Sequence, residues 1–145
     1  RPAIAIANSQ KFLEIDRRLI ARAIRTALAG TPIPGIVSVV FVDDRAISAL
    51  NQRFLNHRGP TDVIAFPLGG CGSKEIWGEI VVSAETACRE ARRRRIPPTE
   101  ELLRYCIHGA LHLAGHDDHA PAARKRMWKA QEEIVENFRA TITGR

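Results

Sequence analysis

The chain has 145 residues, 45% of them hydrophobic, and this size suits one globular domain with a core that needs no disulfide or metal to complete it. No run of 18 or more apolar residues is present, so the sequence predicts no membrane-spanning helix and no membrane partner. The formal net charge of +6, from 22 Lys and Arg against 16 Asp and Glu, suggests a polyanionic partner, and the alternative is a solvated, arginine-rich surface.

The first predicted element is a short strand at residues 3–7. A helix follows, which Asp16 is suited to cap and which Gly30 ends, because apolar residues between them recur three and four positions apart. Residues 36–42 form a run rich in β-branched side chains, which is typical of a strand.

The segment 43–55 opens with two acidic residues and keeps its apolar side chains on one helical face, so we expect a second helix. Strands are predicted at residues 61–68 and 75–83, joined by a glycine-rich loop. Pro67 lacks a backbone N–H, which indicates that the first of these strands lies near an edge of the sheet.

Three helices complete the chain. Ser83 is suited to cap a helix at residues 84–95, and the next helix is expected to begin at Thr99 and to stop at Gly115. Pro121 is expected to begin the last helix, because proline is well tolerated in the first turn.

The pattern indicates the α+β class, with a single mixed sheet of about four strands and about five helices packed against it. Neither an internal repeat nor a long linker divides the chain, so we expect residues 1–145 to form a single domain. The three cysteines form no C-x-x-C pair, and no secretory segment is visible near the start. We therefore expect a reduced protein located in the cytoplasm.

The segment "YCIHGALHLAGHDDHAP", residues 105–121, holds four of the five histidines. His108 and His112 are four residues apart, so on a helix they lie on one face and can bind one cation together. Gly115 would let the chain turn back after the helix, so that a residue beyond it supplies a third ligand. Three protein ligands with an open position are typical of catalytic zinc, although a chance cluster or a structural zinc is an alternative.

The string "HGALHLAGHDDH" resembles the signature H-G-x-L-H-L-x-G-Y-D-H of the YbeY family, the zinc-dependent endoribonucleases of rRNA maturation. Residues 50–67 and 78–83 resemble two further segments of that family. The resemblance implies that His108 and His112 bind one Zn²⁺ per chain and that this metal site lies at the end of a central helix. It also implies a cytoplasmic hydrolase that cuts single-stranded RNA in 16S rRNA 3′-end maturation and ribosome quality control. Its partners would be rRNA and the small ribosomal subunit, with no DNA.

The third ligand departs from the family pattern. Asp118 occupies the position of the family's third histidine, and His119 lies one residue further on. Imidazole leaves zinc more positive than a carboxylate does, so we favour His119 as the ligand and keep Asp118 as the alternative. In that arrangement Asp118 and Asp117 are the candidate catalytic residues, as a proton acceptor or as orienting groups.

The RNA contacts also need reassignment, because Leu55 stands where the family has an arginine. We expect Arg53 or Arg58 to replace it. The basic run at residues 89–95, with Arg92 and Arg93 as its representatives, would guide an RNA backbone toward the metal. The alternative is a solvated helix face, half neutralised by acids four residues before two of its arginines.

Two rival functions remain open. A small zincin-like metallopeptidase is disfavoured, because Gly109 stands where H-E-x-x-H enzymes carry their general base. A nuclease would then take its base from Asp117, from Asp118 or His119, or from the 2′-OH of the RNA. The second rival is a ribosome-assembly adaptor in which the zinc is purely structural.

Overall fold

A computed structural model describes residues 2–59 and 61–144 of the chain. Every segment expected to be a strand or a helix forms that element, with ends that differ by a few residues. In chain order the elements of the described residues are β1 (Ile4–Asn8), α1 (Arg17–Ala27), β2 (Ile36–Val42), α2 (Asp44–Leu55), β3 (Val63–Pro67), β4 (Ile76–Ser83), α3 (Ala84–Arg94), α4 (Pro98–Leu113) and α5 (Pro121–Ile142).

The strands form one mixed sheet in the order β1-β2-β4-β3. β1, β2 and β4 are parallel to one another, whereas β3 runs antiparallel to β4. The α+β class with a single mixed sheet is therefore confirmed. β3 is an edge strand, as Pro67 predicted, and Pro67 pairs with Gly78 at its end.

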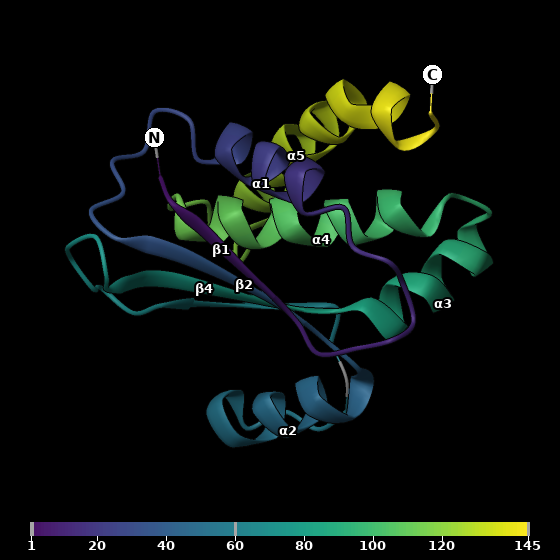
Figure 1. Ribbon diagram of the computed structural model, residues 1–145, viewed down its shortest axis with the longest axis horizontal. Coiled ribbons are helices and arrows are strands. Elements are labelled where there is room, and N and C mark those ends of the chain that lie inside the picture. Colours follow the sequence, from purple (N-terminus) through teal and green to yellow (C-terminus); the bar gives the residue numbers. More distant parts are fainter. Residues whose placement is uncertain (1, 60, 145) are drawn as a thin grey trace.

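The helices cover the two faces of the sheet unequally (Figure 1). α1, α4 and α5 lie over one face, α2 lies against the other, and α3 lies beyond the end of β4. α4 is the central helix, because it packs against the sheet as well as against α1, α3 and α5. Most of its side chains are buried, including the charged side chains of Glu100, Glu101 and Arg104.

The caps predicted at Asp16 and Ser83 are present, and Asp43 caps α2 in the same way. The side chains of Asp16, Asp43 and Ser83 accept hydrogen bonds from backbone N–H groups three residues later. These caps satisfy donors that the first turn of each helix leaves free.

The end of α4 places the candidate site. Gly115 has a φ of +103°, which only glycine adopts readily, and the N–H of His116 donates to the carbonyl of Leu111. The chain therefore reverses directly after the helix and carries residues 116–119 back beside its last turns. No helix formed by residues 2–59 or 61–144 combines the length and the apolarity needed to cross a bilayer.

Candidate functional site

Three side chains converge at the C-terminal end of α4. One ligand atom each from His108, His112 and Asp118 lies within 4.8 Å of the others. The Oδ2 atom of Asp118 is 3.3 Å from Nε2 of His112 and 4.0 Å from Nε2 of His108. All three side chains are half-buried. Two imidazoles and one carboxylate are donors that zinc and other first-row divalent metals accept, so the donor set fits a metal ion.

A side chain of α5 orients the His108 ring through the nitrogen that faces away from Asp118. Its Nδ1 lies 2.7 Å from Oε1 of Gln131, a buried residue whose Nε2 donates to Oε2 of Glu132 at 2.9 Å. Because an ionised carboxylate only accepts, this bond fixes the amide with its oxygen toward the histidine. His108 must then carry its proton on Nδ1, which leaves the Nε2 lone pair facing Asp118 and ready to bind a metal.

Glu132, the acceptor of the Gln131 amide, belongs to a buried network of charged side chains around Arg104. Arg104, 7% exposed, donates to both carboxylate oxygens of Glu132 at 2.8 and 3.0 Å, and also to Glu101 and Glu100. Burial opposes its charge, but the hydrogen bonds to the three acids outweigh burial and raise the pKa of Arg104. Burial likewise opposes ionisation of Glu132, but hydrogen bonds from Arg104 and Gln131 lower its pKa. The carboxylate that fixes Gln131 is therefore ionised.

His112 is held in the neutral form. Burial, and secondly repulsion from the adjacent His108 ring, lower the pKa of His112 despite the nearby carboxylate of Asp118. Only the neutral imidazole has a lone pair for a metal, so this environment suits ligation.

Asp118, and not His119, faces the two helix histidines. His119 has a side chain that is 92% exposed, with its Nε2 3.8 Å from Oδ1 of Asp117. Asp117 also accepts a hydrogen bond from the backbone N–H of His119 at 2.8 Å. The structure thus assembles the alternative triad, because the reversal at Gly115 brings the sixth residue after His112 back to the helix end and turns the next one outward.

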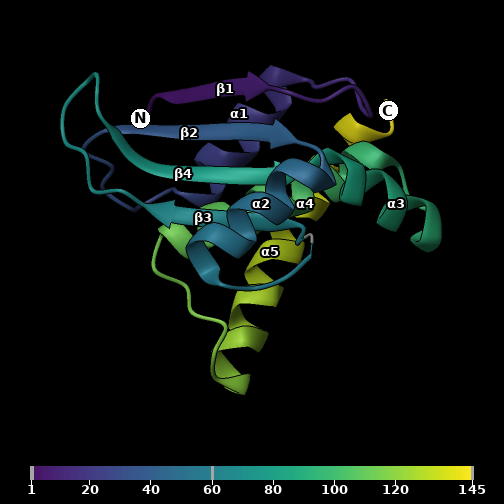
Figure 2. The ribbon, with the colours of Figure 1, turned by 90° about the horizontal axis from the view of Figure 1, so that it is seen from below.

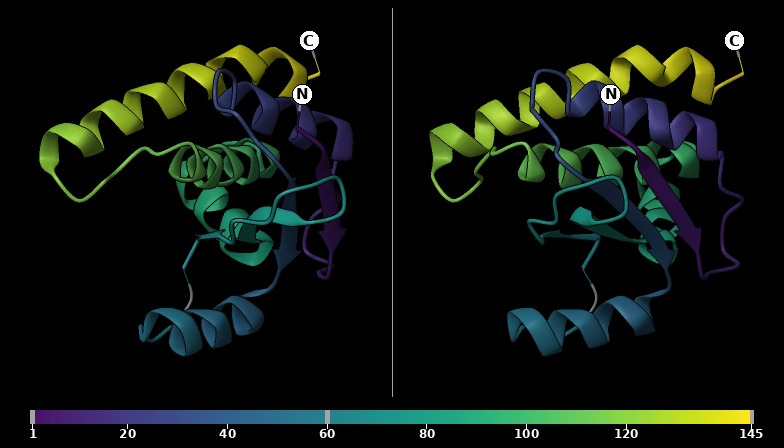
Figure 3. Two further views of the ribbon diagram at one scale, coloured as in Figure 1. Left: turned by 90° about the vertical axis from the view of Figure 1, so that its left-hand side faces the viewer. Right: turned by 60° about the vertical axis from the view of Figure 1, so that its left-hand side comes forward.

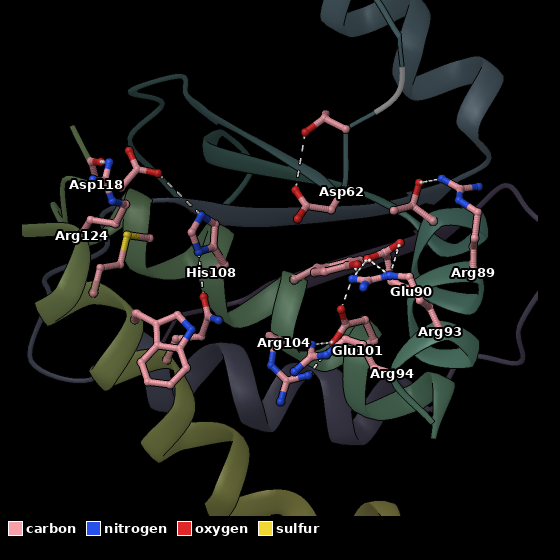
Figure 4. A pocket seen from close by; sticks show the side chains of 16 residues that line it. Asp62, Arg89, Glu90, Arg93, Arg94, Glu101, Arg104, His108, Asp118 and Arg124 are labelled. Atoms are coloured by element: carbon pink, nitrogen blue, oxygen red, sulfur yellow. Dashed lines mark hydrogen bonds and ion pairs between the residues drawn. The ribbon is translucent and has the colours of Figure 1, made fainter. Parts of the chain in front are cut away.

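The candidate metal group lies where two cavities meet. The first cavity has a volume of about 690 Å³ and the second about 630 Å³, which is within the range of ligand sites. The residues that line both are Thr61, Asp62, His108 and Asp118. Figure 4 shows the first cavity, with Asp118 and His108 toward one end, Arg89, Arg93 and Arg94 toward the other, and Asp62 between them. The two cavities therefore adjoin at the candidate metal group and open to it from two sides.

Of the four arginines expected to contact RNA, one lines this cavity. Arg93 does so, whereas Arg53, Arg58 and Arg92 line neither cavity. The guanidinium of Arg53 instead lies 5.2 Å from the centroid of the Phe54 ring. Sequence spacing alone could not reveal this, because a cavity is formed by elements distant in the chain.

Gly109 is a packing position. A Cβ atom there would come within 2.7 Å of Cγ2 of Ile80 and 3.1 Å of Cγ2 of Val63. This side of α4 therefore contacts the sheet and has no room for the glutamate that a metallopeptidase would present there.

Gln131, Glu132 and Arg104 were not predicted from the sequence to support the site. The available signal was a polar residue within an apolar stripe: Gln131 shares the inward face of α5 with Met127 and Val135. A buried polar side chain needs a partner, and here the partner is His108.

The fold and the site together define a small α+β protein with a candidate metal centre at the end of its central helix, open to two cavities. A family model described as "Endoribonuclease YbeY" matches residues 5–139. The chain belongs to the endoribonuclease YbeY family.

Named relatives support this assignment. An "Endoribonuclease YbeY" of Syntrophus aciditrophicus is 38% identical over 139 residues, covering 91% of this chain and 87% of the relative. Another of Chlorobium luteolum is 34% identical, covering 86% of this chain and 90% of the relative. A solution structure of a Thermotoga maritima protein superposes with a TM-score of 0.63 at 28% identity, covering 95% of this chain and 93% of that one.

Proposed function

We propose that the chain is a single-domain, zinc-dependent endoribonuclease that cuts single-stranded RNA. The observation that carries this proposal is the convergence of His108, His112 and Asp118 at the meeting point of two cavities. Family membership supports the reaction class, because the relatives carry the name of an endoribonuclease.

The ligands in this proposal are Nε2 of His108, Nε2 of His112 and a carboxylate oxygen of Asp118. A zinc ion bound there supplies Lewis acidity, which stabilises the charge that develops on a phosphodiester and acidifies water. The hydrogen bond to Gln131 orients the His108 ring, and burial lowers the pKa of His112, which favours its neutral form.

A proton acceptor stands beside this group. With Asp118 on the metal, His119 is left free, and Asp117 lies against its backbone N–H and near its ring. We assign proton transfer to His119 and the orientation of its ring to Asp117. The nucleophile in this proposal is water, and the 2′-OH of the RNA is the alternative.

The biological substrate in this proposal is rRNA, at the 3′ end of 16S rRNA, with the small ribosomal subunit as partner and the cytoplasm as location. Arg93 is the proposed RNA contact in the first cavity. Arg53, Arg58 and Arg92 remain predicted contacts of the same substrate, outside both cavities.

The decisive experiment measures cleavage of a labelled single-stranded RNA by purified protein, with and without chelator and after zinc is restored. We expect cleavage that chelator abolishes and zinc restores, and little cleavage of a duplex of the same sequence. His108→Ala should lose both metal and cleavage. An adaptor with structural zinc would bind RNA without turnover, and a peptidase would instead cleave a peptide panel, an outcome that the packing of Gly109 disfavours.

A further inference from the structure

We infer that the first half of α5 is an RNA-binding element, in which Trp128 stacks on a base of the strand that enters the active site. Residues 121–129 are called the α5 arm below. The inference deepens the proposed function, since it names the surface that takes single-stranded RNA.

The α5 arm carries several exposed cations. Its Lys and Arg side chains are all exposed, and the arm itself contains no acidic residue; these cations are Arg124, Lys125, Arg126 and Lys129. Among the residues that the structure describes, no Asp or Glu lies within ion-pair distance of any of the four. Figures 2 and 3 show this part of α5 projecting beyond the sheet and the other helices.

The basic run at residues 89–95, which the sequence alone favoured, differs because three of its five arginines are paired with acids. Arg89 pairs with Asp44 at 2.8 Å, Arg93 with Glu90 at 2.7 Å, and Arg94 with Glu101 at 2.8 Å. The pairs expected within α3 at i,i+4 do not form, because two of these arginines reach acids on α2 and α4 instead. A paired guanidinium must give up its acid before it binds a phosphate, so the unpaired cations of the α5 arm are the better phosphate contacts.

Trp128 is the aromatic residue of the α5 arm. Its side chain is 62% exposed, yet it lines the same cavity as His108 and Asp118. Arg124, one helical turn before it, lines the cavity too and donates to the backbone carbonyl of Asp118 at 3.3 Å. An exposed indole beside free cations is the pairing that single-stranded nucleic acid uses, because bases stack on aromatic rings while cations hold the backbone.

The arrangement also accounts for a preference for single strands. A base in a duplex is already stacked and paired, so it cannot lie flat on Trp128 without being pulled out. A flexible strand can place a base on the indole and its phosphates along Arg124 and the neighbouring lysines. The nucleotide next to the cut would then be held within the cavity that reaches Asp118.

The test measures RNA binding in chelator, so that it does not depend on cleavage. In a Trp77→Phe variant, Trp128 is the one tryptophan left, and single-stranded RNA should quench its fluorescence. Trp128→Ala should weaken binding by roughly 5- to 150-fold, as loss of one stacked base does, while Trp128→Phe keeps most of the affinity. Phe12→Ala removes another exposed aromatic, 53% exposed on the loop before α1, and should bind as the parent does.

A charge-matched pair of variants tests the cations. The double variant Lys125→Ser with Lys129→Ser should make the slope of log K against log[salt] shallower by about 1.4. Each lost contact with a phosphate of a single strand accounts for about 0.7 of this change. Lys11→Ser with Lys74→Ser removes the same charge from exposed positions that line neither cavity and should change this slope less. Unaltered binding by Trp128→Ala, equal effects of the two double variants, or equal quenching by polyglutamate would each overturn the inference. Normal binding without any cleavage would count against the proposed nuclease alone.

Discussion

Nδ1 of His108 lies 2.7 Å from Oε1 of Gln131, a residue on α5 that is 23 positions further along the chain. This contact joins the candidate metal centre to the buried network around Arg104, because Gln131 also donates to Glu132. The orientation of one imidazole is thereby determined by a charge pair in the core of the protein.

Replacing Gln131 by Leu should weaken zinc binding by about 10- to 100-fold, because Nδ1 of His108 loses the acceptor that fixes its proton. Gln131→Glu keeps an acceptor at that atom and should retain most of the affinity. Competition with a chelating dye measures the affinity, and ¹⁵N chemical shifts of His108 in metal-free protein report which nitrogen carries the proton. Unchanged affinity and an unchanged tautomer in Gln131→Leu would show that the contact only packs.

Asp118→Asn should lose metal, because a neutral amide oxygen is a much poorer zinc ligand than a carboxylate. His119→Ala should keep its metal and lose cleavage rate by about 10²- to 10⁴-fold, the usual contribution of a general base. Elemental analysis and a cleavage assay of both variants distinguish the roles. Loss of metal from His119→Ala, with metal retained in Asp118→Asn, would instead make His119 the third ligand.

Gly109→Ala should destabilise the fold by about 1–3 kcal/mol, because the added methyl group overlaps Ile80 on β4. The sign of the change in the free energy of unfolding is informative, because alanine in place of an unobstructed helical glycine stabilises a protein by about 1 kcal/mol. Urea unfolding gives the difference in the free energy of unfolding. A more stable variant would mean that α4 can move away from the sheet.

Asp44→Asn should lower stability at neutral pH and matter less in acid. Burial tends to raise the pKa of Asp44, but hydrogen bonds from Thr86, Ser83 and Arg89 outweigh burial, so the pKa is lowered on folding. A lowered pKa contributes stability that is present above the unfolded value, near 3.9, and is lost as the pH falls through the folded value. We expect a loss of about 1–2 kcal/mol at pH 7, and urea titrations should show this loss becoming smaller as the pH falls below about 4. A loss of equal size at every pH would exclude ionisation as its source.

Local patterns determined much of the structure and half of the site. The α+β class, the caps at Asp16 and Ser83 and the edge position of β3 all follow from rules that act over a few residues. The pairing of His108 with His112 is equally local, because residues four apart on a helix always share a face.

The tertiary structure decided what lies around those two histidines. Asp118 and His119 are neighbours in sequence, and only the path of the chain after Gly115 turns the first toward the helix and the second to solvent. In the sequence, Gln131 is a polar residue within an apolar stripe and has no evident partner. The packing of α5 on α4 brings its side chain to His108. The arginines of α3 and the cations of the α5 arm look alike in sequence. They differ because α3 lies beside acids of other elements while the arm projects from the body, and that contrast depends on the packing of distant segments.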